Sequence, residues 1–282
     1  MVCQPDRPAG RGLALQAPAV KLAAGQLGIP VEQPTKIRTP EFLAWVRAQN
    51  ADFALVMAYG RILPRTVLDA PRRGCVNLHA SILPRWRGAA PITWAVVKGD
   101  RSTGISLMQM DEGMDTGPVF AIETTPIGED ETAGQLAERL AELAATMVRT
   151  SLLAALSGEL SARPQDESAA TPAPPLRKED GRIDWARSSQ EVHDHVRGMS
   201  PWPGAFTRMG DKTLKILASR RARYTSAGAP PGTVVVADAD AVLVACQGGA
   251  IEIVTAQLEG KKPHSARELV SGRTLRLNML LQ

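Results

Sequence analysis

Asn77 and His79 are the two polar residues of this chain best suited to do chemistry together. They close the segment 74–79 (GCVNLH), whose other side chains are mostly apolar, as is typical of a strand inside a sheet. Side chains two residues apart on a strand point to the same face, so the segment would present an amide beside an imidazole. Acyl transfer needs such a pair, because one group stabilises a developing oxyanion while the other moves a proton.

A carboxylate would complete this pair, because a nearby negative charge raises the pKa of an imidazole and fixes its orientation. Asp111 and Asp115 both follow the next apolar segment, and spacing alone does not choose between them. Each residue taken alone also has a structural use: a buried histidine with satisfied hydrogen bonds, a strand-end amide, or an aspartate that holds a turn.

The elements that must position these residues alternate between strand and helix. The pattern predicts strands at 29–31, 52–58, 74–79, 103–110 and 118–127, and helices at 17–28, 39–50, 63–70, 91–98 and 132–156. Such alternation predicts an α/β fold with a doubly wound, mostly parallel sheet. His79 would then lie at the carboxyl edge of the sheet, where open α/β folds bind their ligands.

The chain changes character after residue 158. Residues 159–180 are rich in proline, alanine and serine, which indicates a linker. Beyond it we expect a helix at 189–198 and short strands at 213–217, 232–236, 241–246 and 250–256. This spacing favours a small antiparallel β-barrel. The predicted domains are therefore 1–158, a linker at 159–180, and 181–282.

Composition excludes several classes of protein. With 282 residues and 44% hydrophobic content, the chain can form real cores. It has no run of eighteen apolar residues and no apolar leader, so we expect neither a membrane partner nor secretion. Its three cysteines are widely spaced in apolar settings, which indicates reduced thiols in a cytoplasmic protein. No Cys or His grouping has metal-ligand spacing, so we expect no metal.

Charge is unevenly distributed along the sequence. Residues 181–282 hold 14 Lys and Arg against 9 Asp and Glu, whereas residues 1–180 hold 19 against 20. A basic C-terminal third favours a polyanionic partner. An ordinary solvated surface is an equally good interpretation of the counts.

Several segments resemble the formyltransferase family that takes its one-carbon unit from 10-formyltetrahydrofolate, and the match is close to the members that act on methionyl-tRNA. The segments are 4–12 (QPDRPAGRG), 58–60 (AYG), 76–79 (VNLH), 81–92 (SILPRWRGAAPI), 108–117 (MQMDEGMDTG), 182–185 (RIDW) and 201–204 (PWPG). The resemblance covers nearly the whole chain. Segment 81–92 is very specific because of its length, whereas 182–185 alone would be weak.

The resemblance implies a catalytic set of Asn77, His79 and Asp115. Asn77 and protonated His79 would donate hydrogen bonds to the oxyanion, and Asp115 would orient the imidazole. The loop that binds the folate co-substrate, 10-formyltetrahydrofolate, would consist of Ser81, Ile82, Leu83 and Pro84. Ile82 stands where the family usually has leucine, a mild change.

The resemblance also implies initiator methionyl-tRNA as the partner of a two-domain monomer with an OB-like C-terminal domain. Arg11 would reach the acceptor end from a glycine-flanked loop. Further candidate phosphate contacts are Arg220, Arg221, Arg223, Lys261 and Lys262. For each of these residues alone, an ordinary surface cation is the favoured interpretation. Two alternative functions stay open: formyl transfer to a small amine, and tRNA binding by a catalytically inactive fragment.

The start of the chain departs from the family pattern. The family begins with a strand and a helix before its QPDRP loop, whereas this sequence reaches that loop at residue 4. The first strand is central in a doubly wound sheet, so the strand at 52–58 would lose a partner. We therefore expect an N-terminally short chain, poorly stable or inactive as written.

Overall fold

A computed structural model describes residues 1–9, 14–224 and 228–282. It divides into two compact units that alternate along the sequence. Unit 1 comprises Met1–His79, Leu107–Ala121 and Ser151–Gln165, and unit 2 comprises Ala80–Ser106, Ile122–Thr150 and Asp166–Gln282. The boundaries expected near residues 158 and 180 therefore stay a prediction.

The described part of unit 1 contains a hairpin, four helices and two parallel strands. Its complete elements are β1 (Arg7–Ala9), β2 (Ala14–Gln16), α1 (Ala19–Gln26), α2 (Pro40–Ala48), β3 (Ala54–Val56), α3 (Arg65–Leu68), β4 (Cys75–His79) and α6 (Leu153–Ser157). Thr39 caps α2 by accepting a hydrogen bond from Phe42 N, and Pro40 occupies the first turn, where its missing N–H costs nothing. Phe42, Val67 and Cys75 contribute to the small apolar core beneath this region.

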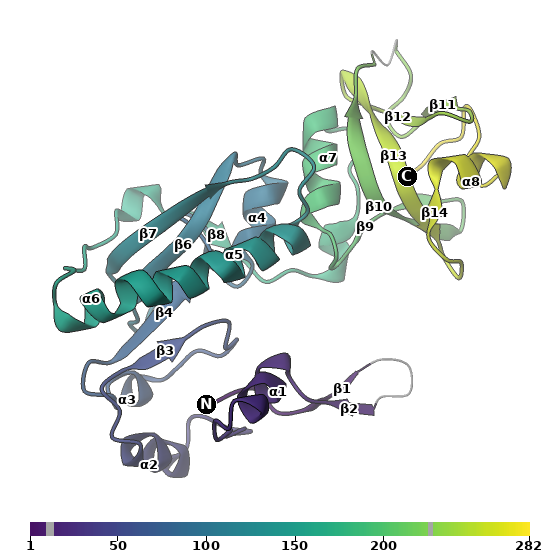
Figure 1. Cartoon of the computed structure of the whole chain (residues 1–282). Helices are drawn as coiled ribbons and strands as arrows, with labels where there is room; N and C mark the ends of the chain where they lie inside the picture. Colours follow the sequence, from purple (N-terminus) through teal and green to yellow (C-terminus); the bar gives the residue numbers. More distant parts are fainter. Residues whose placement is uncertain (10–13, 225–227) are drawn as a thin grey trace. The chain divides into compact units, whose positions relative to one another are not determined.

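The first sheet has the strand order β3-β4-β6-β7 (Figure 1), with β6 at Ser102–Gln109 and β7 at Val119–Pro126. β3 and β4 are parallel, with Val56 opposite Asn77. Met110 N donates to Cys75 O, so the end of β6 meets the start of β4, and these two strands run in opposite directions. The predicted Rossmann-like α/β fold is confirmed, with a sheet that is mixed.

The long helix predicted at 132–156 is present as α5 (Ala133–Met147), a short π-helix at Val148–Leu152, and α6. Thr132 and Gln135 form a reciprocal capping box at its start. Leu136, Leu140 and Ala144 are buried at the four-residue spacing of one helical face. Ala133–Ser157 is long and apolar enough to cross a membrane by length and composition, but a buried core helix passes the same test.

The C-terminal part of unit 2 is an antiparallel sheet with two helices. Its strand order is β11-β12-β13-β10-β9, and β14 pairs with β13. The elements are α7 (Ser189–Gly198), β9 (Ala205–Met209), β10 (Lys212–Ala222), β11 (Val234–Ala237), β12 (Val242–Cys246), β13 (Gly249–Leu258), β14 (His264–Ser265) and α8 (Ala266–Ser271). Leu214, Ile251 and Ile253 are fully buried in its core. The predicted antiparallel domain is confirmed as a sheet.

Several sequence predictions needed correction. The strand expected at 29–31 is absent, and only a single bridge joins Val2 to Glu32 there. The linker contains short elements, at Glu167–Ala169, Pro172–Ala173 (β8) and Lys178–Gly181, and β8 pairs with β5 (Arg87–Gly88). β9, α8 and the β1–β2 hairpin were not predicted from the sequence.

Candidate active site

Asn77 and His79 are placed by β4, as their spacing predicted. Cys75, Val76 and Leu78 are buried and fix the strand in the unit, while Asn77 is half-buried. His79, the last residue of the strand, is only 6% exposed. The strand therefore presents an amide and a largely desolvated imidazole two residues apart.

Asp115 is the carboxylate that meets this imidazole. Its Oδ2 lies 3.5 Å from His79 Nδ1, and the two side chains are 15% and 6% exposed. At this distance the carboxylate can fix the orientation of the imidazole. The structure thus brings two of the three predicted catalytic residues together, with the third two residues away on β4.

Asp111, the rival carboxylate, shapes the loop. Its Oδ1 accepts hydrogen bonds from Gly113 N at 3.1 Å and Thr116 Oγ1 at 2.8 Å. This is an aspartate-capped turn in which the side chain closes the local backbone. Asp111 is therefore engaged in holding the loop that carries Asp115.

Gln165 also holds this loop, and sequence reasoning missed it. Its amide Nε2 donates to the backbone carbonyls of Asp115 and Gly117, at 2.8 Å each. The residue lies in the predicted linker, and a glutamine between proline and aspartate belongs to no motif. No signal in the sequence could have found it, because the contact spans about fifty residues of chain.

The predicted folate loop follows His79 directly in the chain, and its side chains divide into two kinds. Ser81 and Leu83 are buried, and Ser81 Oγ donates to Arg85 O at 2.6 Å. Ser106 Oγ braces the loop by donating to Ser81 O and accepting from Leu83 N. Ile82 and Pro84 are the half-exposed members. A flat ring would therefore meet these two side chains and the loop backbone.

The arginines that follow the loop are engaged in ion pairs. Arg85 donates to both carboxylate oxygens of Asp100, which also accepts from Trp86 Nε1 at 2.7 Å. Arg87 forms a two-bond pair with Glu167 in the linker segment. Both arginines thus brace the backbone around residues 85–88.

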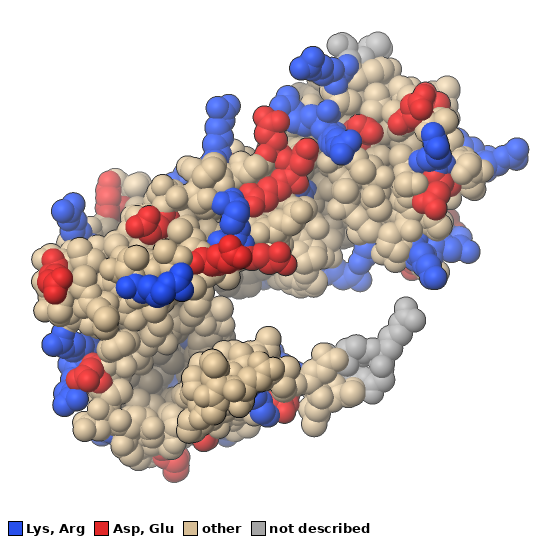
Figure 2. All heavy atoms as spheres, viewed as in Figure 1, with Lys and Arg blue, Asp and Glu red and all other residues tan. Residues whose placement is uncertain are grey.

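The candidate tRNA contacts of the C-terminal sheet lie in two groups. Arg220, Arg221 and Arg223 are exposed at the end of β10, whereas Lys261 and Lys262 are exposed in the turn after β13. Figure 2 shows Lys and Arg side chains spread over the surface that carries β9 to β14, with Asp and Glu among them. Within the described ranges, none of the five forms an ion pair with a carboxylate. Arg11, the remaining candidate, lies outside the described residues.

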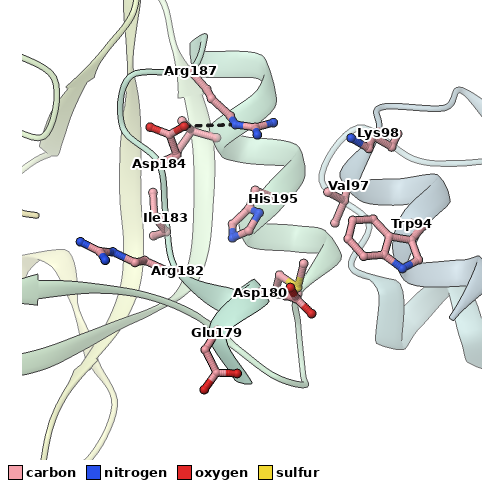
Figure 3. Close-up of a pocket in the computed structure, with 12 residues that line it drawn as sticks. Trp94, Val97, Lys98, Glu179, Asp180, Arg182, Ile183, Asp184, Arg187 and His195 are labelled. Atoms are coloured by element: carbon pink, nitrogen blue, oxygen red, sulfur yellow. Dashed lines mark hydrogen bonds and ion pairs between the residues drawn. The ribbon is translucent and has the colours of Figure 1, made fainter. Parts of the chain in front are cut away.

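A separate pocket of about 240 Å³ opens in unit 2 (Figure 3). Trp94, Lys98, Asp184 and Arg187 contribute to its walls, and none of the predicted site residues lines it. His195 also lines it, and burial lowers the pKa of this imidazole, while a hydrogen bond to the Gly181 backbone opposes the shift. The pocket is therefore distinct from the candidate active site.

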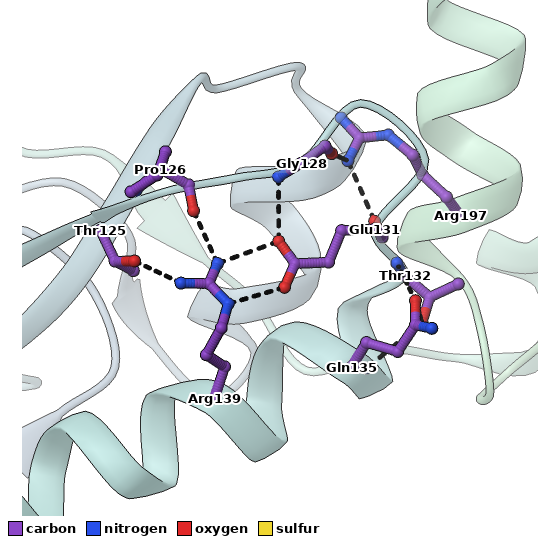
Figure 4. Close-up of polar contacts among 8 residues, drawn as sticks. All are labelled: Thr125, Pro126, Gly128, Glu131, Thr132, Gln135, Arg139 and Arg197. Carbon is purple, nitrogen blue, oxygen red and sulfur yellow. Dashed lines mark hydrogen bonds and ion pairs between the residues drawn. The ribbon is translucent and has the colours of Figure 1, made fainter.

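A second polar cluster in unit 2 is structural (Figure 4). Arg139 on α5 donates two hydrogen bonds to the Glu131 carboxylate, at 2.9 and 3.0 Å, and others to Thr125 and Pro126. The hydrogen bonds from Arg139 lower the pKa of Glu131. Arg197 on α7 donates to Gly128 O and Glu131 O, so α7 is fastened to the loop before α5.

No cluster of three or more His, Cys, Asp or Glu residues that could hold a metal ion occurs in the described part of the chain.

Two family models match the chain. "Formyl transferase" matches residues 1–152, and "Formyl transferase, C-terminal domain" matches residues 175–274. A Sorangium cellulosum protein named "Methionyl-tRNA formyltransferase" is 63% identical over 282 residues, covering 100% of this chain and 91% of that protein. A Myxococcus xanthus protein of the same name is 46% identical over 275 residues, covering 98% of this chain and 87% of that protein.

Solved structures share the fold at low identity. HypX from Aquifex aeolicus in complex with tetrahydrofolic acid has a TM-score of 0.63 and 21% identity, covering 88% of this chain and 43% of that one. WlaRD, a sugar 3N-formyl transferase solved in the presence of dTDP and 5-N-formyl-THF, has a TM-score of 0.65 and 15% identity, covering 88% and 83%.

Proposed function

This chain belongs to the formyl transferase family, and we propose that it transfers a formyl group to the α-amine of methionyl-tRNA. The observation that carries this function is the 63% identity, over the whole chain, with a protein named methionyl-tRNA formyltransferase. The product, N-formylmethionyl-tRNA, serves translation initiation, and we propose that the enzyme works in the cytoplasm. We propose 10-formyltetrahydrofolate as the formyl donor. The proposal is supported by solved structures of this fold that contain tetrahydrofolate or a formyl derivative of it.

The reaction exchanges one C–N bond for another. The neutral α-amine attacks the formyl carbon and its lone pair forms the new C–N bond, while the carbonyl oxygen takes negative charge. The bond to the folate N10 then breaks as the carbonyl re-forms. The ammonium must lose a proton and the folate nitrogen must gain one, so the site needs an oxyanion donor and a proton-transfer group.

The residues at the end of β4 fit these two needs. The Asn77 amide would donate to the oxyanion, and His79 would donate as well and then protonate the leaving nitrogen. Asp115, whose Oδ2 lies 3.5 Å from His79 Nδ1, would fix the orientation of the imidazole. The ammonium proton would leave through Asp115 or a water molecule bound to it.

The folate would lie against the loop that begins at Ser81. Half-exposed Ile82 and Pro84 offer apolar contact to a flat pterin, and the loop backbone offers hydrogen bonds. Ser81 and Leu83 would support the loop without touching the folate through their side chains, because these side chains are buried and Ser81 Oγ donates to Arg85 O.

The direct test is product formation. Purified protein is incubated with 10-formyltetrahydrofolate and methionyl-tRNA, and the amino acid released from the tRNA is analysed by mass. N-formylmethionine is the expected product. A parallel reaction with a nucleotide-linked amino sugar tests the alternative substrate class. Formylation of the sugar alone would overturn the proposal, and so would tRNA binding without product.

A further inference from the structure

The loop that carries Asp115 has a backbone conformation that must be imposed on it. Asp115 has a φ of 55°, in the left-handed region that side-chain-bearing residues rarely adopt. Such a conformation is strained and persists only where neighbouring contacts fix it. The direction of the Asp115 carboxylate depends on this backbone, because a changed φ would swing the side chain away from His79.

The segment before residue 166 supplies those contacts. Arg163 and Val119 exchange two backbone hydrogen bonds, of 2.8 and 2.9 Å, in an antiparallel bridge. Counting two residues further in opposite directions puts Gln165 across from Gly117. From there its amide Nε2 reaches both Asp115 O and Gly117 O at 2.8 Å.

Only glycine fits at position 117, at the end of this loop. A Cβ at that position would lie 1.9 Å from Gln109 O, so the backbone packs directly against its neighbour. The loop is thus fixed at its start by the Asp111 turn and at its end by Gly117. Gln165 holds the stretch between them, where Asp115 lies.

We propose that Gln165 is a positioning residue for the formyl transfer: it holds the backbone at Asp115 so that the carboxylate faces His79. This inference rests on the proposed function. Gln165 lies between the stretches that the two family models match, 1–152 and 175–274. It acts through Asp115, and both residues belong to unit 1.

The main test is the variant Gln165→Leu, which keeps the size of the side chain and removes the donor. Misplacing a catalytic group by about 1 Å can cost about 100-fold in rate. We expect kcat to fall about 10-fold or more, with KM for methionyl-tRNA and for the folate within about twofold of wild type. The matched control is Gln49→Leu. It removes a similar hydrogen bond, from a side-chain amide to the backbone carbonyl of Trp45, outside the site.

A double-mutant cycle separates positioning from general support. If Gln165 acts through Asp115, Gln165→Leu should cost little more on an Asp115→Asn background, because the group it aims has already been disabled. A Gln165→Lys variant retains a donor and should recover part of the lost kcat. Melting curves of every variant report whether the fold survives.

The outcomes distinguish the two proposals. A wild-type protein without formyl transfer would refute the proposed function. Wild-type activity with kcat of Gln165→Leu unchanged, or with full additivity on the Asp115→Asn background, would overturn the role of Gln165 alone. A Lys variant as slow as the Leu variant would also count against it.

Discussion

The 3.5 Å between His79 Nδ1 and Asp115 Oδ2 matters because both side chains are largely removed from water. In a partly desolvated setting a carboxylate acts on an imidazole several times more strongly than in bulk water. We therefore expect the two groups to act as a pair, so that a substitution of either residue changes the rate of formyl transfer.

We expect Asn77→Ala and His79→Ala each to lower kcat by about 100- to 1000-fold, because each removes a donor to the oxyanion. Steady-state kinetics with methionyl-tRNA and 10-formyltetrahydrofolate measure the effect. The control is His264→Ala, which removes an exposed His–carboxylate pair, with Glu268 at 3.8 Å. Near-normal turnover of the Asn77 or His79 variant would refute its role.

The buried thiols are expected to be unreactive in the folded protein. Burial raises the pKa of Cys75 to about 11 and that of Cys246 to about 12, and each side chain is 1% exposed. Because the thiolate is the reactive form, iodoacetamide at pH 8 should label neither residue until the protein is denatured. Mass spectrometry of both samples is the measurement. Rapid labelling of Cys75 in the native protein would contradict this burial.

At the scale of elements, the Glu131–Arg139 pair joins the end of β7 to α5, and Arg197 joins α7 to the same loop. These hydrogen bonds pair backbone carbonyls of the loop that would otherwise have no hydrogen-bond partner. They are concentrated on residues 125–131, so that short stretch holds two helices at once.

Glu131→Gln should lower the free energy of unfolding at pH 7 by about 1–2 kcal/mol, since the variant loses a charge-assisted pair. Arg139 lowers the pKa of Glu131 below its ordinary 4.5. The stabilisation is therefore complete above pH 4.5 and is lost as the pH falls through the lower folded-state pKa. Urea unfolding between pH 7 and pH 3.5 measures this.

The difference in the free energy of unfolding between wild type and Glu131→Gln should shrink as the pH falls from 7 to about 3.5. The control is Glu142→Gln, which changes an exposed residue on α5 and should alter stability little at either pH. A deficit that stays constant down to pH 3.5 would show that the side chain acts by packing and not by charge.

In the C-terminal sheet, the five basic candidates form two groups that lie about 25 Å apart along the strands. Leu214 on β10 pairs with Leu258 on β13, so Lys261 and Lys262 follow at that end of the ladder. Ala222 pairs with Ala250 at the other end, next to Arg221 and Arg223. Eight residues of strand, at about 3.3 Å each, separate the two ends. Arg220 is the weakest candidate, because it lies opposite Glu252.

Each basic group should contribute separately to tRNA affinity. We expect Arg221→Ala with Arg223→Ala, and Lys261→Ala with Lys262→Ala, each to weaken binding and to reduce the slope of log K against log salt by about one to two. Filter binding at several salt concentrations measures both quantities. An unchanged salt slope in a double variant would remove that group from the interface, while Arg220→Ala should have the smallest effect of the five.

The sequence predicted the part of this molecule that depends on local pattern. The apolar run before His79 is a strand, and the Thr132 cap begins a helix, because both follow from spacing and side-chain type. The choice between Asp111 and Asp115 depended on how a loop closes in space. Only the family resemblance favoured Asp115, the carboxylate that lies beside His79 in the structure. α8 was missed although Ser265 and Glu268 form a capping box that the sequence displays. Gln165 could not have been found, since no short-range pattern encodes its contacts.

The strand-like pairing of Arg163 with Val119 also bears on dissecting the protein by limited proteolysis or by recombinant expression of halves. A fragment that ends at residue 158 would contain every motif of the candidate active site, yet it would lack Arg163 and Gln165, which hold the loop that carries Asp115. A fragment that extends to residue 166 would include both residues. The position of the cut within those eight residues should therefore decide whether the isolated fragment keeps Asp115 in place beside His79.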